Sequence, residues 1–265
     1  MLKKLSLLIA SVFVLNGAFA QEPVSKKGIP ILPHKGDWGI GFDAVPIIKY
    51  AGNLFHSSDN NSDLSINYPL SITARYLHRD NVAYRMTLMV DYMSIKTDTL
   101  VPKQGSTNTN EQVADETVEN SATEMLGFGI QYWIGKSRVR GYYGGEFQLS
   151  ANTAKTKYNF GNPLGAQNPV NSRTIEMKQG STFGFGVRGF LGVEVYVAPR
   201  ISVSAEYGFS PLRISSTSAN EVKTESWDGS EVKTETKSTK GKITTIASKT
   251  DSNNGSVSLL FYFAR

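Results

Sequence analysis

Strict alternation of apolar and polar residues is the feature of this sequence that most limits its possible folds. The last eleven residues, from Gly255 to Arg265, carry apolar side chains at every second position: Val257, Leu259, Phe261 and Phe263. Successive side chains of a β-strand point to opposite faces of the sheet, so this segment has one apolar face. Seven earlier segments repeat the pattern, at about 38–50, 68–76, 84–92, 126–134, 139–150, 183–195 and 201–209. The sequence therefore predicts eight strands, each with an apolar and a polar face.

Short and long connections alternate between these predicted strands. Three tight turns, at 79–81, 135–138 and 198–200, alternate with four long loops, at 51–65, 97–121, about 159–179 and about 215–251. Transmembrane barrels show this alternation, because their turns are short at one membrane face and longer at the other. A soluble barrel would point its apolar face inward, whereas the polar face here carries Arg, Asp and Glu, which are costly to bury unpaired. The predicted fold is all-β, an eight-stranded antiparallel up-and-down transmembrane β-barrel.

The first twenty residues have the layout of a secretory signal peptide. A basic start and an apolar run from Leu5 to Leu15 precede a small-x-small cleavage site that ends at Ala20. The apolar run is shorter than the ~20 residues that a membrane-spanning helix needs. We therefore expect a cleaved signal peptide at 1–20, a periplasmic N-terminal leader at 21–36 and the barrel domain at 37–265.

The composition excludes cysteine chemistry and gives no support for nucleic-acid binding. The chain has no cysteine, so neither disulfides nor thiolate metal sites are available. Loss of Lys3 and Lys4 with the signal peptide lowers the formal net charge from +5 to +3. This charge is too small to argue for nucleic-acid binding.

The sequence offers no chemical motif in the context that its chemistry requires. Residues 184–189 match the G-x-G-x-x-G spacing of a dinucleotide-binding loop, but they lie within a predicted strand and no helix follows them. His34, His56 and His78 are widely separated and lack metal-ligand spacing. We expect no catalytic residue, no cofactor and no metal site, and we expect that the protein is not an enzyme, although a Ser/His/acid group near His56 stays open.

Ten charged residues fall on the faces predicted to point into the barrel. Five are acidic and five are basic: Asp43, Asp91, Glu146, Glu194 and Glu206, and Lys49, Arg75, Arg85, Arg140 and Arg188. An eight-stranded barrel is only wide enough for side chains to fill it, and charges in such an interior persist when they are paired. We therefore expect an ion-pair network that closes the lumen. The alternative is a selectivity filter or a proton path.

The predicted outer loops hold the remaining features of interest. The loop at 97–121 is acidic, and the last loop contains two similar segments, at 221–226 and 231–236. Asp228-Gly229 between alternating segments predicts a hairpin. Trp227 beside it is our candidate surface-contact residue, and the alternative is that it packs on the hairpin.

The mature chain resembles the small outer-membrane β-barrel proteins of Gram-negative bacteria, of the OmpA-like transmembrane-domain and OmpX-like class. The resemblance is one of architecture, and the segments from Pro33 to Asp43 and from Tyr50 to Asn53 look like the opening of such barrels. It implies a location in the cell outer membrane, after export by the signal peptide. It also implies contact with membrane lipids including lipopolysaccharide, insertion by the outer-membrane assembly machinery, and a monomer.

Three functions are compatible with this interpretation. The first is a structural or surface-interaction role, in which the loops bind an unknown extracellular ligand. The second is a narrow, porin-like conduit for small solutes. The third is an enzyme that modifies lipids of the outer leaflet. The predicted ion pairs in the lumen favour the first, because conduction requires an open path as well as charge.

Overall fold

The computed structural model describes residues 23–44, 70–108, 110–238, 241–250 and 256–264. The predicted signal peptide, the first predicted loop and Lys49 lie outside these residues. The described chain forms eleven strands: β1 (Trp38–Asp43), β2 (Leu70–Arg79), β3 (Val82–Pro102), β4 (Gln112–Ile134), β5 (Val139–Asn159), β6 (Arg173–Ala198), β7 (Ile201–Thr217), β8 (Glu221–Trp227), β9 (Val232–Ser238), β10 (Ile243–Thr250) and β11 (Ser256–Phe263). None of the described residues belongs to a helix long and apolar enough to cross a membrane.

Eight of these strands form a closed ring. Their order is β1-β2-β3-β4-β5-β6-β7-β11, and β11 pairs back with β1. Ile40 of β1, for example, lies between Phe261 of β11 and Ala74 of β2. Neighbouring strands of the ring are antiparallel throughout, so the predicted all-β antiparallel architecture is confirmed.

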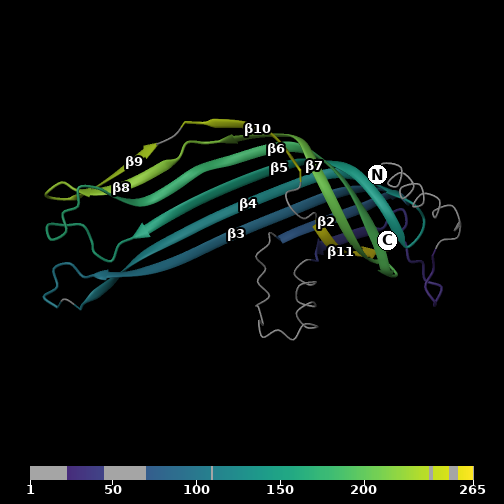
Figure 1. The fold of residues 1–265 in the computed structure, drawn as a ribbon, viewed down its shortest axis with the longest axis horizontal. Coiled ribbons are helices and arrows are strands. Elements are labelled where there is room, and N and C mark those ends of the chain that lie inside the picture. The colour runs from purple at the N-terminus through teal and green to yellow at the C-terminus, as the bar shows by residue number, and fades with distance from the viewer. Residues whose placement is uncertain (1–22, 45–69, 109, 239–240, 251–255, 265) are drawn as a thin grey trace, which may run out of the picture.

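Strands β3 to β6 continue far beyond the ring as one long curved sheet (Figure 1). Strands β3 and β4 pair without a break from Val82 opposite Tyr132 to Pro102 opposite Gln112. The predicted loop at 97–121 is therefore wrong over most of its length, whereas the predicted loop at 159–179 is wrong only at its ends, because residues 160–172 lie between β5 and β6. The prediction ended each strand where its apolar alternation ended, but ladder hydrogen bonds join backbone groups and do not require an apolar face. We call residues 91–124, 151–182 and 218–238 the extension.

The last predicted loop also contains strands. Trp227 pairs with Val232 across Asp228-Gly229, so the predicted hairpin is present, and Gly229 supplies the positive φ of 105° that its turn requires. Its strand β8 pairs with β6 and does not continue β7 or β11. Strand β10 pairs with the second half of β7, from Phe209 to Thr217. Strand β11 pairs with the first half of β7, from Ile201 to Glu206.

The two faces of the ring differ as the alternation predicted. On β3, the outward side chains of Tyr84 and Met86 are 50 % and 42 % exposed, whereas those of Arg85 and Thr87 are 7 % and 6 % exposed. The absence of a side chain on Gly208 makes room for Arg188 in the interior. A Cβ at this position would lie only 2.3–2.5 Å from the Arg188 guanidinium. The ring is therefore apolar outside and polar inside.

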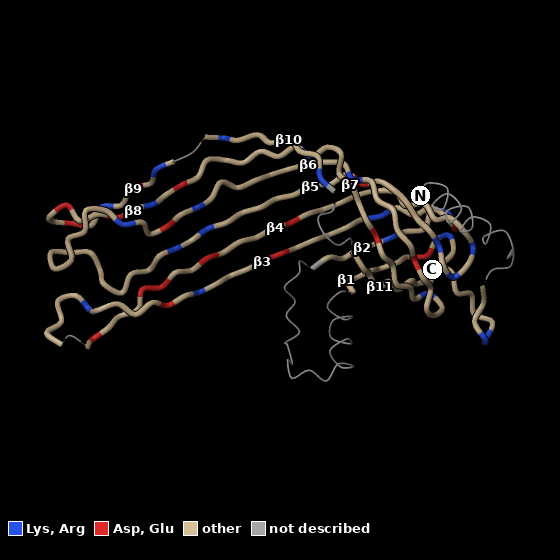
Figure 2. Tube along the Cα trace, viewed as in Figure 1, with Lys and Arg blue, Asp and Glu red and all other residues tan. Residues whose placement is uncertain are grey.

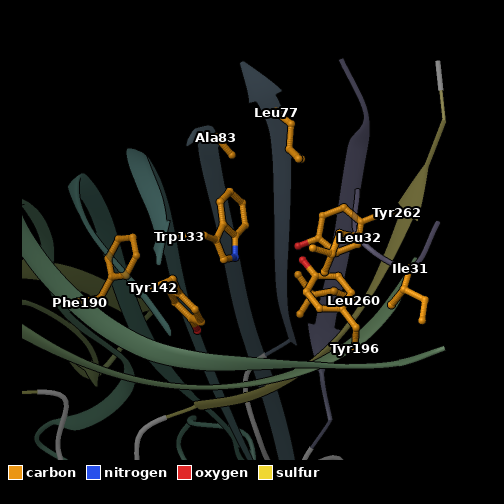
Figure 3. Packing of buried hydrophobic residues seen from close by; sticks show 10 residues of the cluster. All are labelled: Ile31, Leu32, Leu77, Ala83, Trp133, Tyr142, Phe190, Tyr196, Leu260 and Tyr262. Atoms are coloured by element: carbon orange, nitrogen blue, oxygen red, sulfur yellow. The ribbon is translucent and has the colours of Figure 1, made fainter. Parts of the chain in front are cut away.

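An apolar cluster lies at one end of the ring, where the three short turns are (Figure 3). We call this end the base. Its members come from the segment before β1 and from the ring strands: Ile31, Leu32, Leu77, Ala83, Trp133, Tyr142, Phe190, Tyr196, Leu260 and Tyr262. Ile31 has no exposed surface, so part of the predicted leader packs inside the ring.

Candidate functional site

Four charged side chains from four different strands meet in the middle of the ring. The Arg85 guanidinium contacts Glu206 through two nitrogens, with Nη2 3.1 Å from Oε1, and its Nε lies 3.5 Å from Glu146 Oε2. Arg188 Nη1 lies 2.9 Å from Glu206 and 3.3 Å from Glu146. These side chains are between 1 % and 9 % exposed. Each cation therefore contacts both anions, which is how charges are stabilised in a dry interior. We call Arg85, Glu146, Arg188 and Glu206 the central cluster.

A second buried ion pair lies between the central cluster and the base. Arg75 Nη1 donates to Glu194 Oε2 at 3.0 Å, and Glu194 has no exposed surface. The Tyr262 hydroxyl donates to Glu194 Oε1 at 2.7 Å, Ser202 Oγ donates to the same oxygen at 2.5 Å, and Trp133 Nε1 donates to Oε2 at 2.8 Å. Four donors thus satisfy one buried carboxylate. The sequence predicted the two charges, but it did not predict the three neutral donors.

The other predicted interior charges lie elsewhere. Arg140 is buried at the base, where it donates to the backbone oxygen of Asp80 at 3.0 Å and its guanidinium lies 5.3 Å from the Trp133 ring centre. No ion pair of Arg140 occurs among the described residues, so its predicted pairing is wrong in this part of the chain. Asp91 is exposed and makes no ion pair with the described chain, because β3 has passed beyond its last pairing with β2, at Val90.

The six residues of the two buried groups are therefore the predicted charges that the structure brings together: Arg75, Arg85, Glu146, Arg188, Glu194 and Glu206. Asp43 is half-buried and lines a cavity on the side of the central cluster that faces away from the base. Lys49 lies outside the described residues.

Backbone hydrogen bonds hold the segment before β1 in the base. The Arg200 amide donates to the Ile31 oxygen at 3.0 Å, and the Gly36 amide donates to the Leu77 oxygen at 2.8 Å. The Lys35 amide donates to Asp80 Oδ1 at 2.8 Å. These bonds tie the segment to β2 and to the turns after β2 and β6, so it forms part of the base.

On the other side of the central cluster the ring encloses a cavity of about 430 Å³. The central cluster forms its floor, and hydroxyl and charged side chains form its walls. The sequence did not predict this space, because we expected side chains to fill the interior. Glycines such as Gly184 and Gly186 face inward on β6 and leave room where larger residues would fill it.

At the far end of the extension, the residues between β5 and β6 pack against the β8–β9 hairpin. Arg173 Nε lies 2.7 Å from Glu225 Oε1, and the Arg173 guanidinium stacks 4.2 Å from the Phe160 ring centre. Trp227 is half-buried there, and its amide donates to the Val170 oxygen at 3.3 Å. The contact role of Trp227 stays a prediction.

Exposed ion pairs join neighbouring strands of the extension. Acidic residues of the predicted acidic loop lie along β3 and β4 (Figure 2). A hydrogen bond from Lys96 lowers the pKa of Glu116. At the hairpin turn, hydrogen bonds from Lys233 and from the amides of Glu231 and Ser230 hold the pKa of Asp228 below its usual range.

Metal-ligating side chains do not gather in the described part of the chain: no group of three or more His, Cys, Asp or Glu lies close enough together to hold an ion. Comparison with known proteins adds little to this geometry. No family model and no curated protein matches the chain. Among solved structures, the chain is similar to the outer membrane protein OprG from Pseudomonas aeruginosa, with 12 % sequence identity, a TM-score of 0.32, and coverage of 88 % of this chain and 99 % of that one. A likeness of this size carries no functional argument.

Proposed function

We propose that the protein is an integral outer-membrane β-barrel protein that is closed at its base and presents the extension at the cell surface. The observation that carries this proposal is the exposed apolar face of a closed ring. Large apolar side chains on its outward face, including Phe128 at 48 %, Leu191 at 63 % and Phe183 at 57 %, are exposed in succession around the ring. A contiguous apolar surface of this kind is unfavourable in water and favourable in lipid.

The aromatic residues near the base support a membrane position. The ring centres of Trp38 and Tyr76 are 4.9 Å apart, and those of Tyr132 and Tyr143 are 5.5 Å apart. These pairs lie on the outward face near the short turns, where transmembrane barrels carry an aromatic girdle at the lipid–water boundary. Tyr92 lies eight residues along β3 from Tyr84, which corresponds to ~20 Å of height for a tilted strand. The apolar band is thus close in height to a bilayer core.

The interior supports the same conclusion. A soluble ring of this size would need an apolar core along its length, but the middle of this ring holds two sets of buried ion pairs. The only apolar cluster of the described interior lies at the base. Burial of apolar surface by lipid, outside the ring, would supply the missing hydrophobic stabilisation.

Orientation follows from the lengths of the connections. The short turns of the base would face the periplasm, and the extension would project from the opposite face into the medium. In this proposal the protein is a monomer surrounded by lipopolysaccharide, inserted by the outer-membrane assembly machinery, and it is not an enzyme. The extension, with its clustered Arg173, Phe160 and Glu225, carries the surface interaction.

Cell fractionation tests the location. The full-length chain expressed in a Gram-negative host should appear in the outer-membrane fraction and migrate faster on a gel before heating than after it. A variant with Leu88→Arg and Phe128→Arg, which places two charges on the outward face, should fail to insert. A matched variant with Lys155→Glu and Lys233→Glu in the extension should insert normally. Recovery of the unmodified chain in the soluble periplasmic fraction would refute the proposal.

Conductance distinguishes surface interaction from the conduit. In this proposal the central cluster and the base close the interior, so purified protein in planar bilayers should show no steady current above leak. A steady current would favour the conduit over the surface role.

A further inference from the structure

The cavity above the central cluster has the size and lining of a ligand site. Its volume of about 430 Å³ falls within the ~300–1,000 Å³ typical of small-molecule pockets. Hydroxyl groups from four strands line it, including Ser71, Ser204, Ser210, Ser256 and Ser258. Such a lining can donate many hydrogen bonds to a polar ligand.

Two cations of the cavity wall stand apart from the ion pairs below them. The central cluster balances two guanidinium groups with two carboxylates, and Arg75 pairs with Glu194. Arg213 and Lys249 line the cavity above them, and neither makes an ion pair with the described chain. Asp43 is the acidic side chain of this upper wall. Among the described residues of this wall cationic groups therefore exceed anionic ones, and this favours a negatively charged ligand.

The neighbouring strands hold Arg213 across the cavity wall. Arg213 lies opposite Gly186 on β6, and its Nη2 donates to Ser150 Oγ on β5 at 2.8 Å. A Cβ on Gly186 would lie 3.2 Å from the Arg213 Cα, and one on Gly184 would lie 3.0 Å from Ser150 Oγ. The two glycines thus leave the space through which the guanidinium reaches β5. Its single described hydrogen bond, to a neutral hydroxyl, leaves four of its five N–H donors for other acceptors.

Lys249 lines the same cavity from β10, the strand that pairs with the second half of β7. It lies opposite Ser210 in the pairing of β10 with β7, while Arg213 lies opposite Ala247. The two cations therefore project from adjacent strands about two residues apart along the ladder. Ser210, opposite Lys249, also lines the cavity.

We propose that this cavity binds a small soluble anion that carries a carboxylate or phosphate group. Arg213 contacts the anion through its planar fork of donors, which matches the geometry of both groups. Lys249 adds a second positive charge, and the wall hydroxyls donate to the remaining oxygens. The central cluster forms the floor of the cavity, so in this proposal the ligand enters and leaves from the side away from the base. The site does not depend on the membrane location proposed above.

Calorimetric titration of the folded full-length chain, in a phosphate-free neutral detergent, tests this inference with citrate and inorganic phosphate as probes. At least one probe should bind saturably at one site per chain. Arg213→Gln should weaken that binding about tenfold or more, because charge-assisted hydrogen bonds are lost. Lys249→Gln should weaken it severalfold. Lys233→Gln, which removes the same charge from an exposed position of the β8–β9 hairpin, should leave the affinity unchanged and serves as the control.

Heat-modifiable gel migration confirms the fold of each variant. If Arg213→Gln does not fold, Arg213→Lys provides the second test, since it keeps the charge but loses the fork and should still weaken binding. Absence of saturable binding of both probes up to about 10 mM would overturn the inference. Equal affinity of Arg213→Gln, Lys249→Gln and the unmodified chain would also overturn it, as would binding of a short-chain anionic lipid but of neither soluble anion. Cell fractionation is unaffected by any of these results, so failure here is distinct from failure of the proposed function.

Discussion

Removal of one carboxylate from the central cluster is the most informative perturbation of the interior. Glu206 contacts both Arg85 and Arg188, and the three side chains are 4 %, 6 % and 9 % exposed. The change Glu206→Gln keeps the shape of the side chain but removes its charge. Two buried guanidinium groups would then share the single carboxylate of Glu146. Breaking a buried ion pair in this way costs ~3–5 kcal/mol, a large part of the ~5–15 kcal/mol by which a typical protein is stable.

Urea unfolding in phospholipid vesicles, followed by tryptophan fluorescence, measures this cost. The matched control is Glu235→Gln, which removes the same charge from a residue that is 63 % exposed and that pairs, within the described chain, only with Lys237, at 3.0 Å. An exposed pair contributes at most ~1 kcal/mol, so the control should change the free energy of unfolding little. Equal losses for the two variants would refute the claim that the central cluster is buried and paired.

A double variant tests the physical cause. Adding Arg85→Met to Glu206→Gln removes one cation and leaves Arg188 with Glu146, at 3.3 Å. If the loss in the single variant comes from uncompensated positive charge, the double variant should recover part of the stability. A further loss, equal to the sum of the two single changes, would show that the charges do not interact.

Three further predictions concern other parts of the chain. Gly208→Val should destabilise the ring in the same unfolding assay, because its side chain would displace the Arg188 guanidinium, and an unchanged midpoint would contradict the packing seen here. Ile31→Asp should cost ~3 kcal/mol or more, because it places a charge without a partner in the base, whereas a variant as stable as the unmodified chain would show that the segment before β1 does not close the ring. The pKa of Asp228 should be lower in the folded chain than the ~3.9 of an unfolded one, because of its hydrogen bond from Lys233, so the turn is fully stabilised above the unfolded value and loses this stabilisation as pH falls through the folded value. Carbon-13 NMR of the carboxyl group during an acid titration measures this, and a midpoint at the ordinary value would contradict it.

The strands of the ring could be predicted from sequence because lipid-facing and interior-facing positions differ in polarity at every second residue. Tyr84, Met86 and Leu88 show this clearly against Arg85 and Thr87. The extension could not be predicted in the same way. Both faces of β3 beyond Tyr92 are exposed, so no polarity difference marks the strand. Its ladder with β4 depends on backbone pairing, which leaves no trace in side-chain polarity.

The candidate site was predictable in part for a similar reason. Alternation along each strand identifies which charged residues face the interior. Pairing among them could be predicted because a buried charge needs an opposite charge nearby. Besides Arg75, the partners of Glu194 are a tyrosine, a serine and a tryptophan, and these residue types occupy interior positions for many reasons. Their role depends on distances across the ring, which a single sequence does not contain. The position of Arg140 at the base depends in the same way on the turn after β2.

Accessibility of spin labels along one strand tests the central claim most directly. The chain has no cysteine, so a single cysteine introduced at each position from Tyr84 to Val90 carries one label at a known site. In lipid vesicles, labels at the outward positions Tyr84, Met86, Leu88 and Val90 should collide with oxygen, which dissolves in lipid, and not with a water-soluble nickel complex. Labels at Arg85 and Thr87 should collide little with either reagent, because they are enclosed by the ring. Strong collision of the outward labels with the nickel complex, or the loss of the two-residue period, would contradict a membrane-embedded ring with a closed interior.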